Sequence, residues 1–98
     1  MQITYKNKKL KKICTIADEA ITKYGDKNAI KLQQRIQEIE AANSVDLLVK
    51  KHIGRCHLLT GDRKNQYAMD LSHPLRLIFE VKGIDINIVR IIEIVDYH

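Results

Sequence analysis

The chain has 98 residues, 45% of them hydrophobic, which suffices for one domain with one core and excludes a second independent unit. Seventeen lysines and arginines against twelve aspartates and glutamates give a formal net charge of +5, which favours an anionic partner such as nucleic acid or an acidic protein. No stretch has the length and apolarity of a signal peptide or a membrane span, and two cysteines are too few for a disulfide framework, so we expect a cytoplasmic protein that does not act at a membrane.

The first half of the chain has the spacing of helices. Met1 to Tyr5 predicts a short strand, after which apolar residues recur at steps of three and four. This first stripe consists of Leu10, Ile13, Ala17, Ala20, Ile21 and Tyr24. Gly25 is expected to stop the helix, and Asp26 is a candidate N-cap for a second one. The second helix has its own buried stripe, formed by Ala29, Leu32, Ile36 and Ile39.

Beyond Ile53 the apolar period changes to two, the repeat of a strand that buries one side. Strands are expected at Cys56 to Leu59, Tyr67 to Leu71, Leu75 to Val81 and Ile86 to Tyr97. In the third of these, alternation turns Arg76 away from the core. Short turns between the last strands indicate antiparallel neighbours. The expected fold is therefore α+β: one domain over residues 1–98, with two N-terminal helices on one face of a small antiparallel sheet.

Cleaving an RNA backbone without a metal requires a base for the 2′-hydroxyl, an acid for the leaving oxygen, and cations for the charge on phosphate. Histidine suits the first two roles because its ordinary pKa is about 6.5. His57 precedes a glycine-containing loop in which Arg63 and Lys64 supply positive charge. Arg76 is the best candidate for gripping a phosphate, because its planar fork meets two oxygens at once.

A second histidine cluster ends the chain. His98 follows directly after Asp96 and Tyr97, and period-two alternation predicts that Asp96 and His98 share one side of the last strand. There the carboxylate would orient the ring, while an aromatic side chain would stack on an unpaired base. These residues also have plain structural interpretations, because terminal residues often fray and Arg76 is able to pair with Glu80 or Glu93 on the sheet surface.

Three stretches of the C-terminal half together resemble the HigB-type plasmid-maintenance killer proteins of the RelE/ParE toxin superfamily. They are His57 with Gly61-Asp62-Arg63-Lys64-Asn65-Gln66-Tyr67, then Leu75-Arg76-Leu77-Ile78-Phe79-Glu80, and finally Asp96-Tyr97-His98. The ending is the most specific of the three. In the helical half the agreement is one of layout, without any diagnostic residue.

The resemblance implies an endonuclease that needs no metal or cofactor and cuts mRNA in the ribosomal A site, on the 30S subunit with its 16S rRNA. It also implies a helix-turn-helix antitoxin that silences the protein. The catalytic cluster carried over by position comprises His57, Asp96, Tyr97 and His98, with Arg76 as the arginine that grips phosphate. Arg63 lies in the shared Gly-Asp-Arg loop near the substrate, and Lys64 follows it.

One departure from the family pattern bears on activity. The family has Pro-Leu-Lys-Gly after its histidine, whereas this chain has Leu58-Leu59-Thr60-Gly61, so the lysine is replaced by Thr60. Arg63 or Lys64 are candidates for supplying the missing charge. Two alternatives stay open on the sequence: a non-catalytic toxin that acts on DNA gyrase, as relatives resembling the ParE branch do, and an inactive basic binding protein of the same fold.

Overall fold

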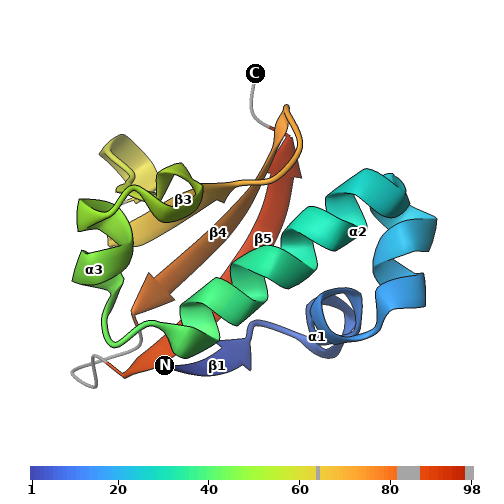
Figure 1. Ribbon diagram of the computed structural model, residues 1–98, viewed down its shortest axis with the longest axis horizontal. Coiled ribbons are helices and arrows are strands. Elements are labelled where there is room, and N and C mark those ends of the chain that lie inside the picture. The colour runs from blue at the N-terminus through green and yellow to red at the C-terminus, as the bar shows by residue number, and fades with distance from the viewer. Residues whose placement is uncertain (64, 82–86, 97–98) are drawn as a thin grey trace.

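The computed structural model describes residues 1–63, 65–81 and 87–96 (Figure 1). Its helices are α1 (Lys8–Thr15), α2 (Ala17–Ala41) and α3 (Val45–Lys50), with two 3-10 turns, η1 (Ile53–Arg55) and η2 (Gly61–Arg63). Its strands are β1 (Gln2–Tyr5), β2 (His57–Leu58), β3 (Gln66–Asp70), β4 (Leu75–Val81) and β5 (Ile88–Asp96). The predicted α+β layout and the short N-terminal strand are confirmed. No helix within these residues is both long enough and apolar enough to span a bilayer.

The sheet has the order β1-β5-β4-β3-β2. Strands β2 to β5 pair antiparallel, as predicted, but β1 pairs parallel with β5, so the sheet is mixed. A parallel pair needs a long connection between its strands, and here every other element of the chain lies between β1 and β5. Strand β5 is thus central over its first half, in agreement with its apolar residues on both faces.

The helical half is more broken than its continuous apolar stripe indicates. Instead of one helix from Leu10 to Tyr24, α1 ends at Thr15, and the next residue, Ile16, has an extended backbone with φ −115° and ψ 111°. Asn7 caps the start of α1 by accepting a hydrogen bond from the Leu10 amide at 2.8 Å. Gly25, at φ 85° and ψ 167°, interrupts α2, which agrees with the predicted stop at this glycine.

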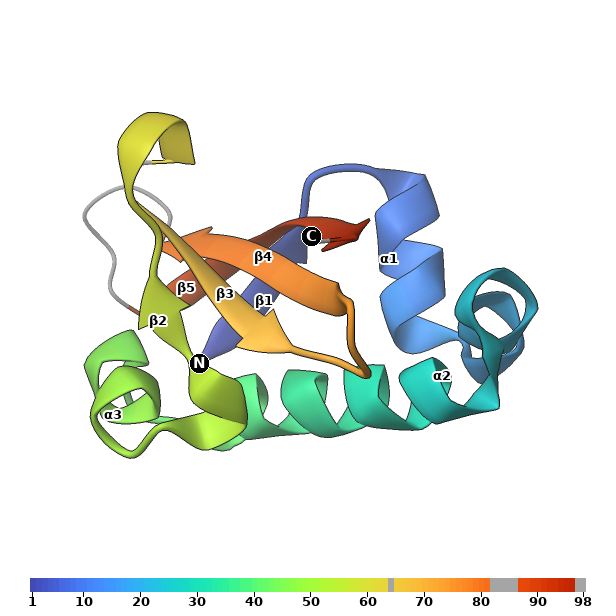
Figure 2. The same cartoon turned by 90° about the horizontal axis from the view of Figure 1, so that it is seen from above.

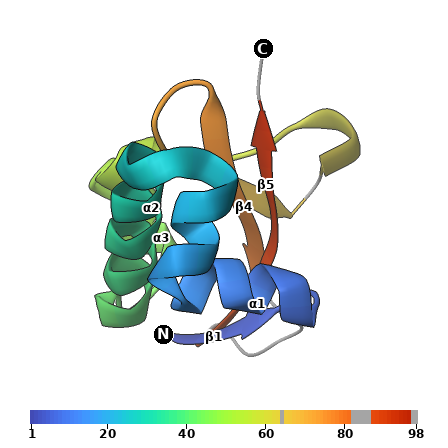
Figure 3. The ribbon, with the colours of Figure 1, turned by 90° about the vertical axis from the view of Figure 1, so that its right-hand side faces the viewer.

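The helices cover one face of the sheet and leave the other open. Figure 2 shows α2 along one face and α1 beside the edge of β5, and Figure 3 shows η2 on the side away from α2. The main core lies under the helices and contains most of the predicted stripes. Its members include Leu10, Ile13, Ala20, Ala29, Leu32, Ile36, Ile39, Leu77 and Phe79. Ile21, predicted to be buried, is 39% exposed.

Candidate nucleic-acid interface

The open face of the sheet has an apolar floor bordered by charged side chains. Residues directly opposite each other in antiparallel strands share a face, and the register joins His57 to Ala68, Ala68 to Ile78, and Ile78 to Glu93. A second row joins Asp70 to Arg76. The floor is a small cluster separate from the main core, formed by Leu59, Ala68, Ile78, Ile92 and Val95.

His57 lies on β2 at the edge of this floor and is half-buried. Its ring atom Nδ1 is 2.8 Å from the carbonyl oxygen of Arg55. A carbonyl oxygen only accepts hydrogen bonds, so this contact places the hydrogen of the neutral ring on Nδ1 and leaves Nε2 with a free lone pair. This tautomer is the one a general base requires at Nε2.

Arg76 lies on β4, two strands away from His57, and forms an ion pair with Asp70, with Nε 3.4 Å from Oδ1. The other oxygen of the same carboxylate, Oδ2, is 3.4 Å from Nε of Arg55 on η1. Neighbouring strands are about 4.8 Å apart and residues rise about 3.4 Å along a strand, so the Cα atoms of His57 and Arg76 are roughly 12 Å apart. Side chains of this length are able to meet over one phosphodiester between them.

Arg63 reaches the same face from η2. Its Nη2 is 2.5 Å from Oε1 of Glu93 on β5, and its Nη1 donates a hydrogen bond to Oε1 of Gln66 at 3.1 Å. Glu80, the other carboxylate considered as a partner of Arg76, is 3.7 Å from Nη1 of Arg90. Arg76 therefore lies on the face away from the main core, as the alternation predicted, and Arg63 contacts the same face through Glu93. Lys64 lies outside the described residues.

The C-terminal part of the predicted cluster has only one described member. Asp96, the last residue of β5, is opposite Leu75, which packs against the main core. By register Asp96 shares the helix-covered face with Leu75, while Arg76 shares the open face with Val95. Tyr97 and His98 lie outside the described residues, so their convergence on Arg76 and His57 stays a prediction.

The structure adds two residues that the sequence analysis did not single out, Arg55 and Asp70. One signal for Asp70 was available, because aspartate is depleted in strands and a charged residue inside a predicted strand calls for a partner. Arg55 had no such signal. Its position next to Asp70 depends on the left-handed backbone of η1, where His52, Gly54 and Arg55 all have φ between 55° and 58°.

A buried arginine joins η1 and the end of β3 to the helical layer. Arg35 on α2 is only 7% exposed, and its Nε donates a hydrogen bond to the backbone oxygen of Asp70 at 2.7 Å. Its Nη1 donates to Oε1 of Glu38, also at 2.7 Å. Gly54 lies directly against this guanidinium, since a Cβ built at Gly54 would be 2.6 Å from Nε of Arg35. The position of Asp70 therefore depends on α2 through Arg35.

Replacing Gly54 with Ala is expected to lower the free energy of unfolding by about 3 kcal/mol, because it combines a left-handed backbone penalty with a steric clash against Arg35. Gly61→Ala is the matched control, since Gly61 also has a positive φ, of 70°, but open space around its Cβ position. We expect that control to cost only about 1 kcal/mol. Urea denaturation of both variants measures the difference, and equal losses would contradict the role assigned to the Gly54 contact.

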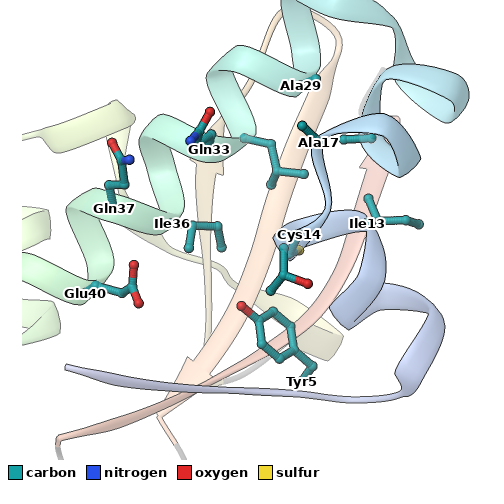
Figure 4. A pocket seen from close by; sticks show the side chains of 12 residues that line it. Tyr5, Ile13, Cys14, Ala17, Ala29, Gln33, Ile36, Gln37 and Glu40 are labelled. Atoms are coloured by element: carbon teal, nitrogen blue, oxygen red, sulfur yellow. The ribbon is translucent and has the colours of Figure 1, made fainter.

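A cavity of about 280 Å³ lies on the helical side, between β1, α1 and α2 (Figure 4). Tyr5 and Cys14 line one side, and Ile36, Gln37 and Glu40 line the other. Burial raises the pKa of the Cys14 thiol and of the Tyr5 hydroxyl to about 12 in each case. Both groups are protonated at neutral pH, so neither is prepared to act as a nucleophile. Among the described residues, no group of three His, Cys, Asp or Glu side chains has the arrangement of a metal site.

Neither a protein-family model nor a curated protein matches the sequence. A solved structure described as a YoeB/ParE toxin from Agrobacterium tumefaciens is similar in fold, with a TM-score of 0.63 and 14% sequence identity. The match covers 100% of this chain and 99% of that chain. The chain thus has the α+β fold of RelE/ParE-type toxins, and at this identity the likeness is one of fold.

Proposed function

We propose that this chain is the toxin of a toxin-antitoxin pair and that it cleaves mRNA in the ribosomal A site, as the resemblance to HigB-type proteins implies. The observation that carries the proposal is the open face of the sheet. It gathers His57, with Nε2 available as a base, and the guanidinium groups of Arg63 and Arg76 around one apolar floor. An apolar floor suits the stacking of bases, and the arginines suit the phosphates.

In this proposal the open face performs a transesterification. His57 removes the proton of a 2′-hydroxyl through Nε2, and the resulting oxygen attacks the adjacent phosphorus while the 5′-oxygen leaves. The product is a 2′,3′-cyclic phosphate on one fragment and a 5′-hydroxyl on the other. Arg76, assisted by Arg63, stabilises the negative charge on the phosphorane. By resemblance, His98 would protonate the leaving oxygen and Asp96 would orient its ring, although the register places Asp96 on the face opposite to that of Arg76.

The remaining assignments follow from the resemblance. Tyr97 stacks on a base or assists proton transfer, and Lys64 contacts the backbone beside Arg63. Neither a metal nor a cofactor takes part. The partners are mRNA on the 30S subunit, with its 16S rRNA, and a helix-turn-helix antitoxin, all in the cytoplasm. Arg63 is ion-paired with Glu93, but exposed pairs of this kind contribute only about 0–1 kcal/mol, so a phosphate competes effectively for its guanidinium group.

The test is to induce the protein in bacteria and map the 5′ ends of a translated message. We expect new 5′ ends at codon-spaced positions within translated regions, and their loss in His57→Gln, which keeps a polar side chain but has no basic nitrogen. His73→Gln, in the turn before β4, is the matched control and should cleave normally. Stalled growth with intact mRNA and damaged DNA would overturn the nuclease proposal in favour of action on DNA gyrase.

A second measurement addresses the chemistry. Cleavage on ribosomes programmed with a defined mRNA should continue when EDTA is added and magnesium is kept at the level that ribosomes need. The released fragments should carry cyclic phosphate ends. A strict requirement for added zinc or manganese would contradict the mechanism.

A further inference from the structure

We infer that Arg55 is a third RNA-binding arginine of the open face, beside Arg63 and Arg76, and that Asp70 holds Arg55 and Arg76 together as a pair that grips the RNA backbone. The inference rests on the proposed function, because it assigns RNA as the ligand. It begins with one carboxylate that serves two guanidinium groups: Oδ1 of Asp70 is 3.4 Å from Nε of Arg76, and Oδ2 is 3.4 Å from Nε of Arg55. We call these three residues the arginine pair and its bridging aspartate.

The three side chains differ in exposure in a way that fits these roles. The Arg55 side chain is 76% exposed, while those of Arg76 and Asp70 are each 26% exposed. Oδ1 of Asp70 is fully buried and accepts no hydrogen bond, so the charge of Arg76 is what compensates it. Arg55 is therefore able to turn toward a ligand, while Arg76 and Asp70 are held within the sheet.

Two guanidinium groups close to each other repel electrostatically, and the carboxylate of Asp70 between them offsets this repulsion. The arrangement leaves a net charge of +1 on the three groups. Each guanidinium carries N–H donors on its two Nη atoms in addition to the Nε that faces Asp70, since arginine has five N–H groups. Those donors are suited to phosphate oxygens, which arginine binds with two parallel hydrogen bonds.

The backbone at Arg55 supports a functional reason for the residue. Arg55 has a φ of 55°, a left-handed conformation that residues other than glycine adopt at a cost. The chain places a non-glycine residue there, directly after Gly54, which already has a φ of 58°. Strained positions of this kind concentrate at ligand-binding sites, where the surrounding structure holds them. Here the contact between Gly54 and Arg35, together with the hydrogen bond from Arg35 to the Asp70 carbonyl, fixes η1 beside β3.

The test measures binding of a single-stranded 2′-O-methyl RNA oligonucleotide, which cannot be cleaved at its blocked 2′-oxygens, at several salt concentrations. Each phosphate contact contributes about 0.7 to the slope of log Kd against log salt for single strands. We expect Arg55→Ala and Arg76→Ala each to lower that slope by about 0.7. The matched control is Arg90→Ala, on the same face and paired with Glu80, which should leave the slope unchanged. A slope for Arg55→Ala equal to that of the control would overturn the inference.

Asp70→Asn tests the bridging role, because it raises the net charge by one. General electrostatics predicts tighter RNA binding, whereas loss of the bridge predicts weaker binding and a lower slope. We expect Asp70→Asn to bind RNA more weakly and with a lower slope, and Asp70→Glu, which keeps the carboxylate, to recover the binding. If Asp70→Asn binds RNA as tightly as wild type or more tightly, the role of Asp70 is overturned. We expect the variants of residue 70 to fold, because the hydrogen bond from Arg35 is made to the backbone oxygen of this residue and does not need its side chain. Thermal unfolding checks this. The two proposals fail in different ways. If the wild-type protein cleaves mRNA but Arg55→Ala binds RNA as wild type does, only the role of the arginine pair is overturned. If Arg55→Ala and Arg76→Ala lower the salt slope as expected but the wild-type protein cleaves no mRNA, only the nuclease proposal is overturned.

Discussion

Arg76→Ala is expected to reduce mRNA cleavage on programmed ribosomes about a hundredfold to a thousandfold. Removing one preorganised group that stabilises the developing charge of a transition state typically has an effect of about this size. Arg76 lies on β4 next to the buried Ile78, and its Nε is 3.4 Å from Asp70, so the guanidinium is held before the substrate arrives. Single-turnover cleavage at saturating enzyme measures the effect on the chemical step.

Two further variants make this result specific. Arg76→Lys keeps the positive charge but loses the planar fork, so we expect a rate between those of wild type and Arg76→Ala. Arg90→Ala removes an arginine of comparable exposure, 30% against 26%, from the same face, and it should cleave at the wild-type rate. A reduction of similar size in Arg90→Ala would mean that total charge, and not the position of Arg76, determines the rate.

The fold was largely predictable because its buried faces have clear periods. Steps of three and four identified the stripes of α1 and α2, and steps of two identified β3, β4 and β5. The parallel pairing of β1 was not predictable, because short-range patterns carry no information about a partner at the other end of the chain. The break at Ile16 was also hidden, since the apolar stripe continues across it while the backbone becomes extended.

The residues of the candidate site also include some that the sequence predicts and some that it does not. Alternation along β4 correctly directed Arg76 away from the core. The ion pair of Arg63 with Glu93 on the same face was not predicted, since it joins the loop after β2 to a strand far along the chain. Arg55 and Asp70 could not be predicted as a pair, since their proximity depends on a left-handed turn and on the buried Arg35 beneath it. Alternation also could not tell which face Asp96 occupies, because that depends on the register between β4 and β5 and on an irregularity between Ile78 and Phe79.

Alkaline conditions are expected to destabilise the protein steeply from pH 9 upward. Burial raises the pKa of Cys14 and of Cys56 from 9.0 to about 12, and Cys56 is only 2% exposed. Between pH 9 and pH 12 both thiols stay protonated in the folded protein but ionise in the unfolded chain. The unfolded state then binds fewer protons, so the free energy of unfolding falls as pH rises, whereas below pH 9 the contribution is fully retained.

The size of this effect makes it measurable. Each thiol contributes about 1.4 kcal/mol per pH unit, so the two together lower the free energy of unfolding by up to about 5 kcal/mol between pH 9 and pH 11, a large part of the 5–15 kcal/mol typical of a domain. Tyr5, whose pKa burial raises from 10.0 to about 12, adds to the decrease above pH 10. Urea denaturation at pH 8, 9 and 10 isolates the thiols, because the tyrosine contribution begins only near pH 10. The double variant Cys14→Ala/Cys56→Ala should show a nearly flat profile from pH 9 to pH 10, and a slope as steep as that of wild type would contradict the assignment to these two buried thiols.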